Sequence, residues 1–189
     1  MRSLGLAIIL LLAGATAATA QDSFRGDAAA TYQWVRSNAG PGQCGCFGLN
    51  GGGLSGSWNF KGPWSLVLDY SAGYANNAPT AGSSLTLTSY LSGVRFAIPQ
   101  PWFEGKHKPQ PFGQFLIGAA HAGGGVAGYG DGTYVFALRL GGGVDVPVST
   151  RFAVRVIQVD YYRTQFTNAT NDRQNNLLLG VGIVFHWSR

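Results

Sequence analysis

Large apolar residues alternate with small or polar ones along much of the chain, and the clearest case is Asn175–Trp187. Its odd-numbered positions are all large and apolar, namely Leu177, Leu179, Val181, Ile183, Phe185 and Trp187. Successive side chains of a β-strand point to opposite faces, so this segment presents one continuous apolar face. The pattern predicts a strand whose apolar face must be covered by protein or by lipid.

Seven further segments show comparable alternation, and together they predict an all-β fold of eight strands. The predicted strands are Ala28–Ser37, Leu49–Phe60, Trp64–Tyr74, Ser84–Ile98, Pro111–Ala122, Thr133–Val146, Arg151–Arg163 and Asn175–Trp187. Each is close to the length that a tilted membrane strand needs, about 9–11 residues.

In two of these strands the alternation of apolar and polar positions is interrupted. In the seventh, an unbroken count places Gln158 and Asp160 on the apolar face. An extra residue near Ile157, forming a β-bulge, would return both to the polar face. We expect a similar slip near Thr88 in the fourth strand.

The connections alternate in length. Longer segments rich in Gly, Asn and Pro follow the first, third, fifth and seventh strands, whereas the second and sixth end in the tight turns Lys61–Pro63 and Pro147–Thr150. Pro99–Gln110, after the fourth strand, is long and departs from this scheme. Short turns alternating with longer loops are typical of an antiparallel up-and-down barrel.

Composition favours a barrel in a membrane. Charged residues make up 11% of the chain, against about 25% in soluble domains, and aromatic residues make up 13%. No stretch after residue 20 is apolar over the about 20 residues of a membrane helix. The basic residues are scattered, which argues against a nucleic-acid partner. The sequence therefore predicts an eight-stranded transmembrane β-barrel.

The first 20 residues have the features of a cleaved signal peptide. Arg2 provides a positive start, Leu6–Ala13 an apolar core, and Ala18–Ala20 a small-residue cleavage site. Removing residues 1–20 takes away one of the 13 basic residues and none of the 8 acidic ones. We expect residues 21–189 to form a single barrel domain.

Charges within the strands are expected to face the interior, because an arginine on the lipid face costs about 2–4 kcal/mol. The set comprises Asp69, Arg95, Arg139, Asp145, Arg155 and Asp160. An eight-stranded barrel has room inside only for side chains, and buried charges must be paired. The sequence thus predicts a luminal plug of Arg–Asp pairs, with a gated narrow ion path as the alternative.

Outward-facing aromatic residues gather towards the strand ends. They are Trp34, Trp58, Trp64, Tyr70, Tyr134, Tyr161, Phe185 and Trp187. Such residues form girdles at both interfaces of a membrane barrel, whereas a soluble core would concentrate them in mid-strand.

Candidate chemistry is sparse. Cys44 and Cys46, one residue apart, predict a local disulfide in an exported protein, with a reduced pair or a soft-metal contact as alternatives. Arg36–Ala39 is similar to the His-x-Ser-Asn motif of outer-membrane lipid A deacylases but lacks its histidine. Without a neighbouring base Ser37 is not an activated nucleophile, so we expect no enzymatic activity, no cofactor and no metal site.

Together these features resemble the small bacterial outer-membrane β-barrels, the OmpA-like/OmpX-like family of barrel domains. The residues Leu179, Val181, Ile183, Phe185 and Trp187 resemble the C-terminal signal by which the barrel-assembly machinery recognises its clients. In the family this signal often ends on the aromatic residue, whereas Ser188 and Arg189 follow it here. The resemblance implies an outer-membrane location and a monomer, with lipid, the assembly machinery and periplasmic chaperones as partners.

The resulting hypothesis is a non-enzymatic outer-membrane protein with a plugged polar lumen, acting in envelope integrity, surface interaction or slow passage of small solutes. A narrow porin-like channel and a soluble, exported ligand-binding barrel of the lipocalin type are the alternatives. A lipid-modifying enzyme is the least favoured. The soluble barrel would carry its charges outside, whereas Asp69 and Arg139 lie opposite the apolar faces of their strands.

Overall fold

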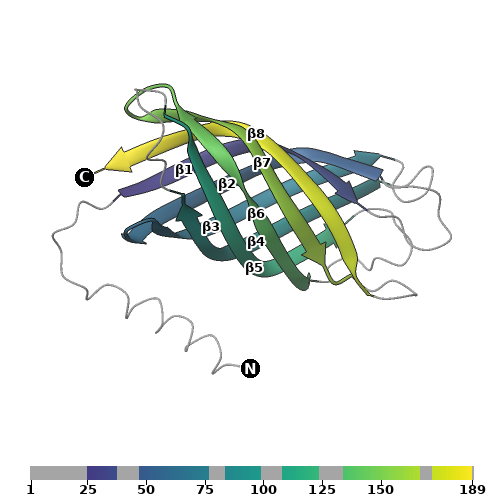
Figure 1. Ribbon diagram of the computed structural model, residues 1–189. Coiled ribbons are helices and arrows are strands. Elements are labelled where there is room, and N and C mark those ends of the chain that lie inside the picture. Colours follow the sequence, from purple (N-terminus) through teal and green to yellow (C-terminus); the bar gives the residue numbers. More distant parts are fainter. Residues whose placement is uncertain are drawn as a thin grey trace.

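The chain forms a closed barrel of eight strands, each paired with its sequence neighbours (Figure 1). The computed structural model describes residues 25–37, 47–76, 84–98, 108–123, 134–166 and 172–188. The strands are β1 (Arg25–Ser37), β2 (Phe47–Lys61), β3 (Trp64–Asn76), β4 (Ser84–Ala97), β5 (Gln110–Gly123), β6 (Tyr134–Pro147), β7 (Phe152–Thr164) and β8 (Gln174–Ser188). The predicted signal peptide, residues 1–20, lies outside the described residues.

Antiparallel pairing of β8 with β1 closes the barrel, with Arg25 opposite Ser188 and Arg36 opposite Leu177. Closure leaves no strand edge unpaired, which removes the usual site of edge-to-edge aggregation. Every strand agrees with its predicted range to within three residues at either end. The predicted all-β, eight-stranded, up-and-down barrel is therefore confirmed.

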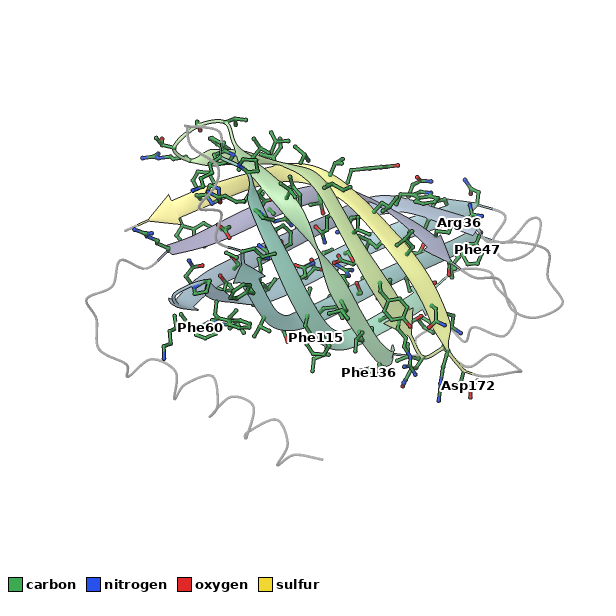
Figure 2. The ribbon with its side chains drawn as sticks, viewed as in Figure 1. Arg36, Phe47, Phe60, Phe115, Phe136 and Asp172 are labelled. Carbon is green, nitrogen blue, oxygen red and sulfur yellow. The ribbon has the colours of Figure 1, made fainter. Side chains whose placement is uncertain are left out.

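The two ends of the barrel differ in how the strands are joined. The turn end holds Lys61–Pro63 and residues 148–151, together with the start of β1 and the end of β8. Figure 2 labels Phe60 at this end and Arg36 and Phe47 at the opposite one, here called the loop end.

A left-handed glycine stabilises one of the short turns, and hydrogen bonds within the turn stabilise the other. Gly62 has a φ of 54°, a left-handed conformation that a residue without Cβ adopts at little cost. In the β6–β7 turn, the amides of Val148 and Ser149 donate to the Phe152 carbonyl at 2.9 and 3.0 Å. The Ser149 hydroxyl accepts from the amides of Phe152 and Arg151, at 3.0 and 3.3 Å.

The predicted bulge in β7 is confirmed. Its register against β8 shifts between Arg155 and Gln158, and the two residues in between are both exposed, Val156 by 48% and Ile157 by 47%. The extra residue keeps Gln158 and Asp160 inside the barrel, where they are 2% and 0% exposed.

The predicted slip near Thr88 is wrong. β4 pairs with β3 and with β5 without any shift in register. Leu85 and Leu91 instead point inward and are 7% and 3% exposed. The expectation failed because the loop-end half of the interior is itself apolar, so a leucine there does not mark the outer face.

The outer face of the barrel is apolar along its length. Leu68, Leu140 and Ile183 are 50%, 54% and 59% exposed, and Phe115 and Phe136 project from the outer surface (Figure 2). The described residues contain no helix long and apolar enough to span a membrane.

Candidate functional site

Arg139 on β6 is among the most deeply buried charges of the interior, with a side chain that is 0% exposed. Its Nη1 donates to Oδ1 of Asp69 on β3 at 2.8 Å, and its Nη2 donates to the Ser71 hydroxyl at 2.9 Å. A longer bond of 3.4 Å reaches the Ser89 hydroxyl on β4. A buried charge needs such partners, and these three come from β3 and β4, neither of which is paired with β6.

A second ion pair lies nearer the turn end. Arg155 donates from Nε and Nη2 to the two oxygens of Asp145, at 2.8 and 3.0 Å. Its Nη1 donates to Oε1 of Gln158 at 3.0 Å. This two-pronged geometry is the strongest arrangement of an arginine with a carboxylate. The β7 bulge makes it possible, because both Arg155 and Gln158 then face inward.

Amide side chains extend this pair across the interior. Gln158 donates from Nε2 to Asp160 at 2.6 Å, and Gln114 on β5 donates to both oxygens of Asp160 at 3.2 Å. The Oε1 atom of Gln114 accepts from Nη2 of Arg95 at 3.3 Å. Asp160, expected in an Arg–Asp pair, is thus held by two glutamines.

Aromatic rings separate the positive charges. Phe112 lies between two arginines, with its ring centroid 4.6 Å from Cζ of Arg95 and 4.5 Å from Cζ of Arg155. Tyr162 lies 5.2 Å from Cζ of Arg139. Each contact contributes about 0.5–2 kcal/mol.

Glycines on β6 provide the space for these groups. A methyl group added at Gly141 would overlap Oδ1 of Asp160, and one added at Gly143 would lie 2.9 Å from Cζ of the Phe112 ring. The run Gly141–Gly143 is therefore a packing feature that lets large side chains meet in a narrow barrel.

The loop-end half of the interior is filled by aliphatic and aromatic side chains. Val35, Leu49, Leu178 and Phe166 belong to this cluster and are at most 6% exposed. Between the cluster and the charged half lies a cavity of about 10 Å³, lined by Gln33, Ser71, Ser89 and Tyr162 among others. Such a cavity has room for one water molecule and not for a continuous path.

The turn end opens into a cavity of about 650 Å³, here called the mouth. Its charged lining residues are Arg25, Asp27, Arg95, Asp145, Arg151 and His186. Asp27 accepts from the Ser57 hydroxyl at 2.5 Å, and its other oxygen lies 2.7 Å from Nδ1 of His186. Every strand except β7 contributes to the lining.

All six residues of the predicted luminal set are buried. Their exposed fractions are 8% for Asp69, 6% for Arg95, 0% for Arg139, 7% for Asp145, 1% for Arg155 and 0% for Asp160. The sequence analysis predicted the interior face for Gln158, but it did not identify Gln158, Gln114, Ser71 and Ser89 as uncharged partners of these charges, and it missed Asp27. Each of these residues lies on the same face of its strand as the charges. The alternation of side chains along each strand could therefore have identified them as interior residues.

The predicted girdle residues lie on the outer face. Trp58, Trp64, Phe185 and Trp187 lie near the turn end, and Trp34, Tyr134 and Tyr161 lie near the loop end. Tyr70 differs from the expectation: it lies in the middle of β3, with its ring centroid 5.2 Å from that of Tyr90 on β4. The predicted assembly signal occupies the outer face of β8, where Phe185 packs 5.3 Å from Phe152.

The residues weighed for chemistry are not gathered into a site. Ser37 is buried, and its hydroxyl donates to Oδ1 of Asn176 at 2.6 Å. Cys44 and Cys46 lie outside the described residues. Within the described part of the chain, no three His, Cys, Asp or Glu side chains are grouped so that they could hold a metal ion.

Solved structures of other proteins share this architecture, and two of them serve as examples. The attachment invasion locus protein Ail of Yersinia pestis is 12% identical, with a TM-score of 0.53, over 89% of this chain and 100% of that one. Neisserial surface protein A is 13% identical, with a TM-score of 0.56, over 87% of this chain and 99% of that one. At these identities the likeness extends to the fold alone. No curated protein matches the sequence.

The family model gives the assignment. The model of the outer membrane protein beta-barrel domain matches residues 6–185, which is nearly the whole chain. The apolar outer face is therefore the surface that meets lipid, and the protein is located in the bacterial outer membrane. The chain belongs to the outer membrane β-barrel domain family.

Proposed function

We propose that this protein is a closed outer-membrane barrel that does not conduct, and that it acts as a non-enzymatic structural component of the envelope. The observation that carries the proposal is the ion pair between Arg139 and Asp69, whose side chains are 0% and 6% exposed. A water-filled pore would leave both groups hydrated.

The free energy needed to open the barrel interior supports this proposal. Separating a buried ion pair leaves two uncompensated charges and costs about 3–5 kcal/mol. An open state at that free energy would be populated at roughly 1% or less. The aliphatic cluster at the loop end, which includes Leu49 and Leu178, would have to move as well.

The environment of Ser37 supports a non-enzymatic role. The partner of its hydroxyl is the amide oxygen of Asn176, and an amide cannot take up a proton as a general base. The motif similar to that of lipid A deacylases therefore has, among the described residues, no base beside its serine.

We also propose that the loop end faces the cell exterior and is where surface interactions occur. Connections 38–46 and 124–133 join strands at this end, and longer loops are extracellular in barrels of this kind. Ail is named for attachment, and its likeness in fold is compatible with such a role.

Conductance in planar lipid bilayers tests the closed interior. The wild-type protein should give no resolved channel steps, whereas Arg139→Ala should give measurable conductance because it removes the ion pair. Arg36→Ala is the matched control, since Arg36 is an exposed arginine near the loop end. Steady wild-type conductance would establish a narrow channel instead, and silence from Arg139→Ala would refute the plug.

Complementation of a deletion strain tests the envelope role. A variant carrying both Arg139→Met and Asp69→Leu keeps the interior filled and removes its central charges. We expect this variant to restore detergent resistance as well as the wild type does. Restoration by the wild type alone would show that the polar interior itself is needed.

A further inference from the structure

Arg95 is bonded far less completely than the other interior arginines. All three outer nitrogens of the Arg155 guanidinium donate hydrogen bonds, at 2.8, 3.0 and 3.0 Å. Arg139 uses both of its Nη atoms. Among the described residues, Arg95 has a single hydrogen bond, from Nη2 to Gln114 at 3.3 Å. Its Nε, like that of Arg139, is buried without a partner.

The nearest carboxylate, that of Asp27, does not supply the missing hydrogen bonds of Arg95. Nη1 of Arg95 lies 3.8 Å from Oδ2 of Asp27, too far for a hydrogen bond. Both oxygens of Asp27 already have closer partners, the Ser57 hydroxyl at 2.5 Å and Nδ1 of His186 at 2.7 Å. An arginine whose side chain is only 7% exposed is thus left with unused donors. A buried polar group in this condition points to a missing partner such as an ion or a water.

Arg95 also lies where a ligand could reach it. Its guanidinium lies 4.6 Å from the Phe112 ring centroid, and both residues line the mouth. The mouth measures about 650 Å³, within the range of small-molecule sites, roughly 300–1,000 Å³.

The lining of the mouth is electropositive. Asp145 is neutralised by its two-pronged bond to Arg155, which leaves Asp27 as the remaining carboxylate among the described lining residues. The same lining contains Arg95, Arg25 and Arg151, and the last two are exposed. Asn59, Ser65, Gln110 and Thr150 add hydrogen-bonding groups, while Pro111 and Phe112 add apolar wall.

We propose that the mouth is a binding site for a small organic anion, whose phosphate or carboxylate group is held by Arg95 with Arg25 and Arg151 at the rim. The planar guanidinium fork matches both groups. Because short turns face the periplasm in barrels of this kind, the anion would come from the periplasm or from the head groups of the inner lipid leaflet. The inference does not depend on whether the barrel conducts.

Calorimetric titration of the full chain in a zwitterionic detergent tests the site, with sn-glycerol 3-phosphate as the probe. We expect saturable binding to the wild type, at least tenfold weaker binding to Arg95→Gln, and an intermediate affinity for Arg95→Lys, which keeps the charge but not the fork. Arg36→Gln, which removes an arginine at the opposite end, should bind as the wild type does. Absence of binding to the wild type, or equal binding to Arg95→Gln, would overturn the proposal.

Two additions keep the test decisive. If Arg95→Gln does not fold, the double variant Arg25→Gln/Arg151→Gln changes only exposed side chains, and it should weaken binding several-fold. Unchanged affinity in that variant would count against the site. In phosphatidylcholine nanodiscs, loss of probe binding on adding phosphatidylglycerol would assign the site to lipid head groups, and retention would assign it to a soluble anion.

Discussion

Nη1 of Arg139 on β6 lies 2.8 Å from Oδ1 of Asp69 on β3, so a single ion pair joins two strands that are not neighbours in the barrel. The residues are 70 positions apart in the chain. Backbone hydrogen bonds hold each strand only to its neighbours, whereas this contact crosses the interior. It therefore links β3 directly to β6, which backbone pairing between neighbouring strands cannot do.

Replacing only one member of the Arg139–Asp69 pair should destabilise the protein. Arg139→Met or Asp69→Leu alone leaves one buried charge without a partner, and each should lower the free energy of unfolding by about 3–5 kcal/mol. The double variant should lose much less. Urea unfolding in phospholipid vesicles gives the four values of this cycle. Single-variant losses below about 1 kcal/mol, the range of exposed pairs, would mean that the pair is hydrated.

A methyl group at Gly141 should destabilise the barrel. It would overlap the Val159 carbonyl and the Asp160 carboxylate, so we expect Gly141→Ala to cost about 1–3 kcal/mol in the same unfolding assay. Gly113→Ala is the control, because the nearest atom to its added methyl is the Gly141 carbonyl oxygen at 3.8 Å. Equal effects of the two substitutions would argue against close packing around Asp160.

An arginine on the lipid face should be penalised according to its depth. Leu140 lies in mid-strand and is 54% exposed, while Val148 lies in the β6–β7 turn and is 53% exposed. Leu140→Arg should cost about 2–4 kcal/mol and Val148→Arg about 0–1 kcal/mol, since the penalty falls towards the membrane interface. Similar costs at both sites would contradict the membrane position inferred for β6.

The predicted assembly signal can be separated from stability. Phe185→Ala should lower the fraction of folded protein in isolated outer membranes, because it removes an aromatic residue of the recognised pattern, while refolding of the purified chain into vesicles should change little. Phe136→Ala is the control, since Phe136 is also an outer-face aromatic, 46% exposed against 37% for Phe185. Equal losses for both variants in cells would remove the case for a signal at Phe185.

The strands could be predicted because alternation is a local property of the chain. The β7 bulge could also be predicted, since Gln158 and Asp160 would otherwise face lipid. The same reasoning failed in β4, where Leu85 and Leu91 fill an apolar part of the interior and the contrast between the two faces is lost. Alternation reports polarity, and it cannot tell a lipid environment from an apolar core.

The amino-acid sequence by itself determined the number of strands, their approximate limits and the inward face of the six predicted luminal charges, because these depend on near neighbours in the chain. Only the tertiary structure decided that Arg139 meets Asp69, that glutamines hold Asp160, and that Arg95 keeps unused donors at the mouth. These contacts join strands distant in sequence. Their geometry follows from the tilt and stagger of all eight strands in the closed barrel, which no single strand encodes.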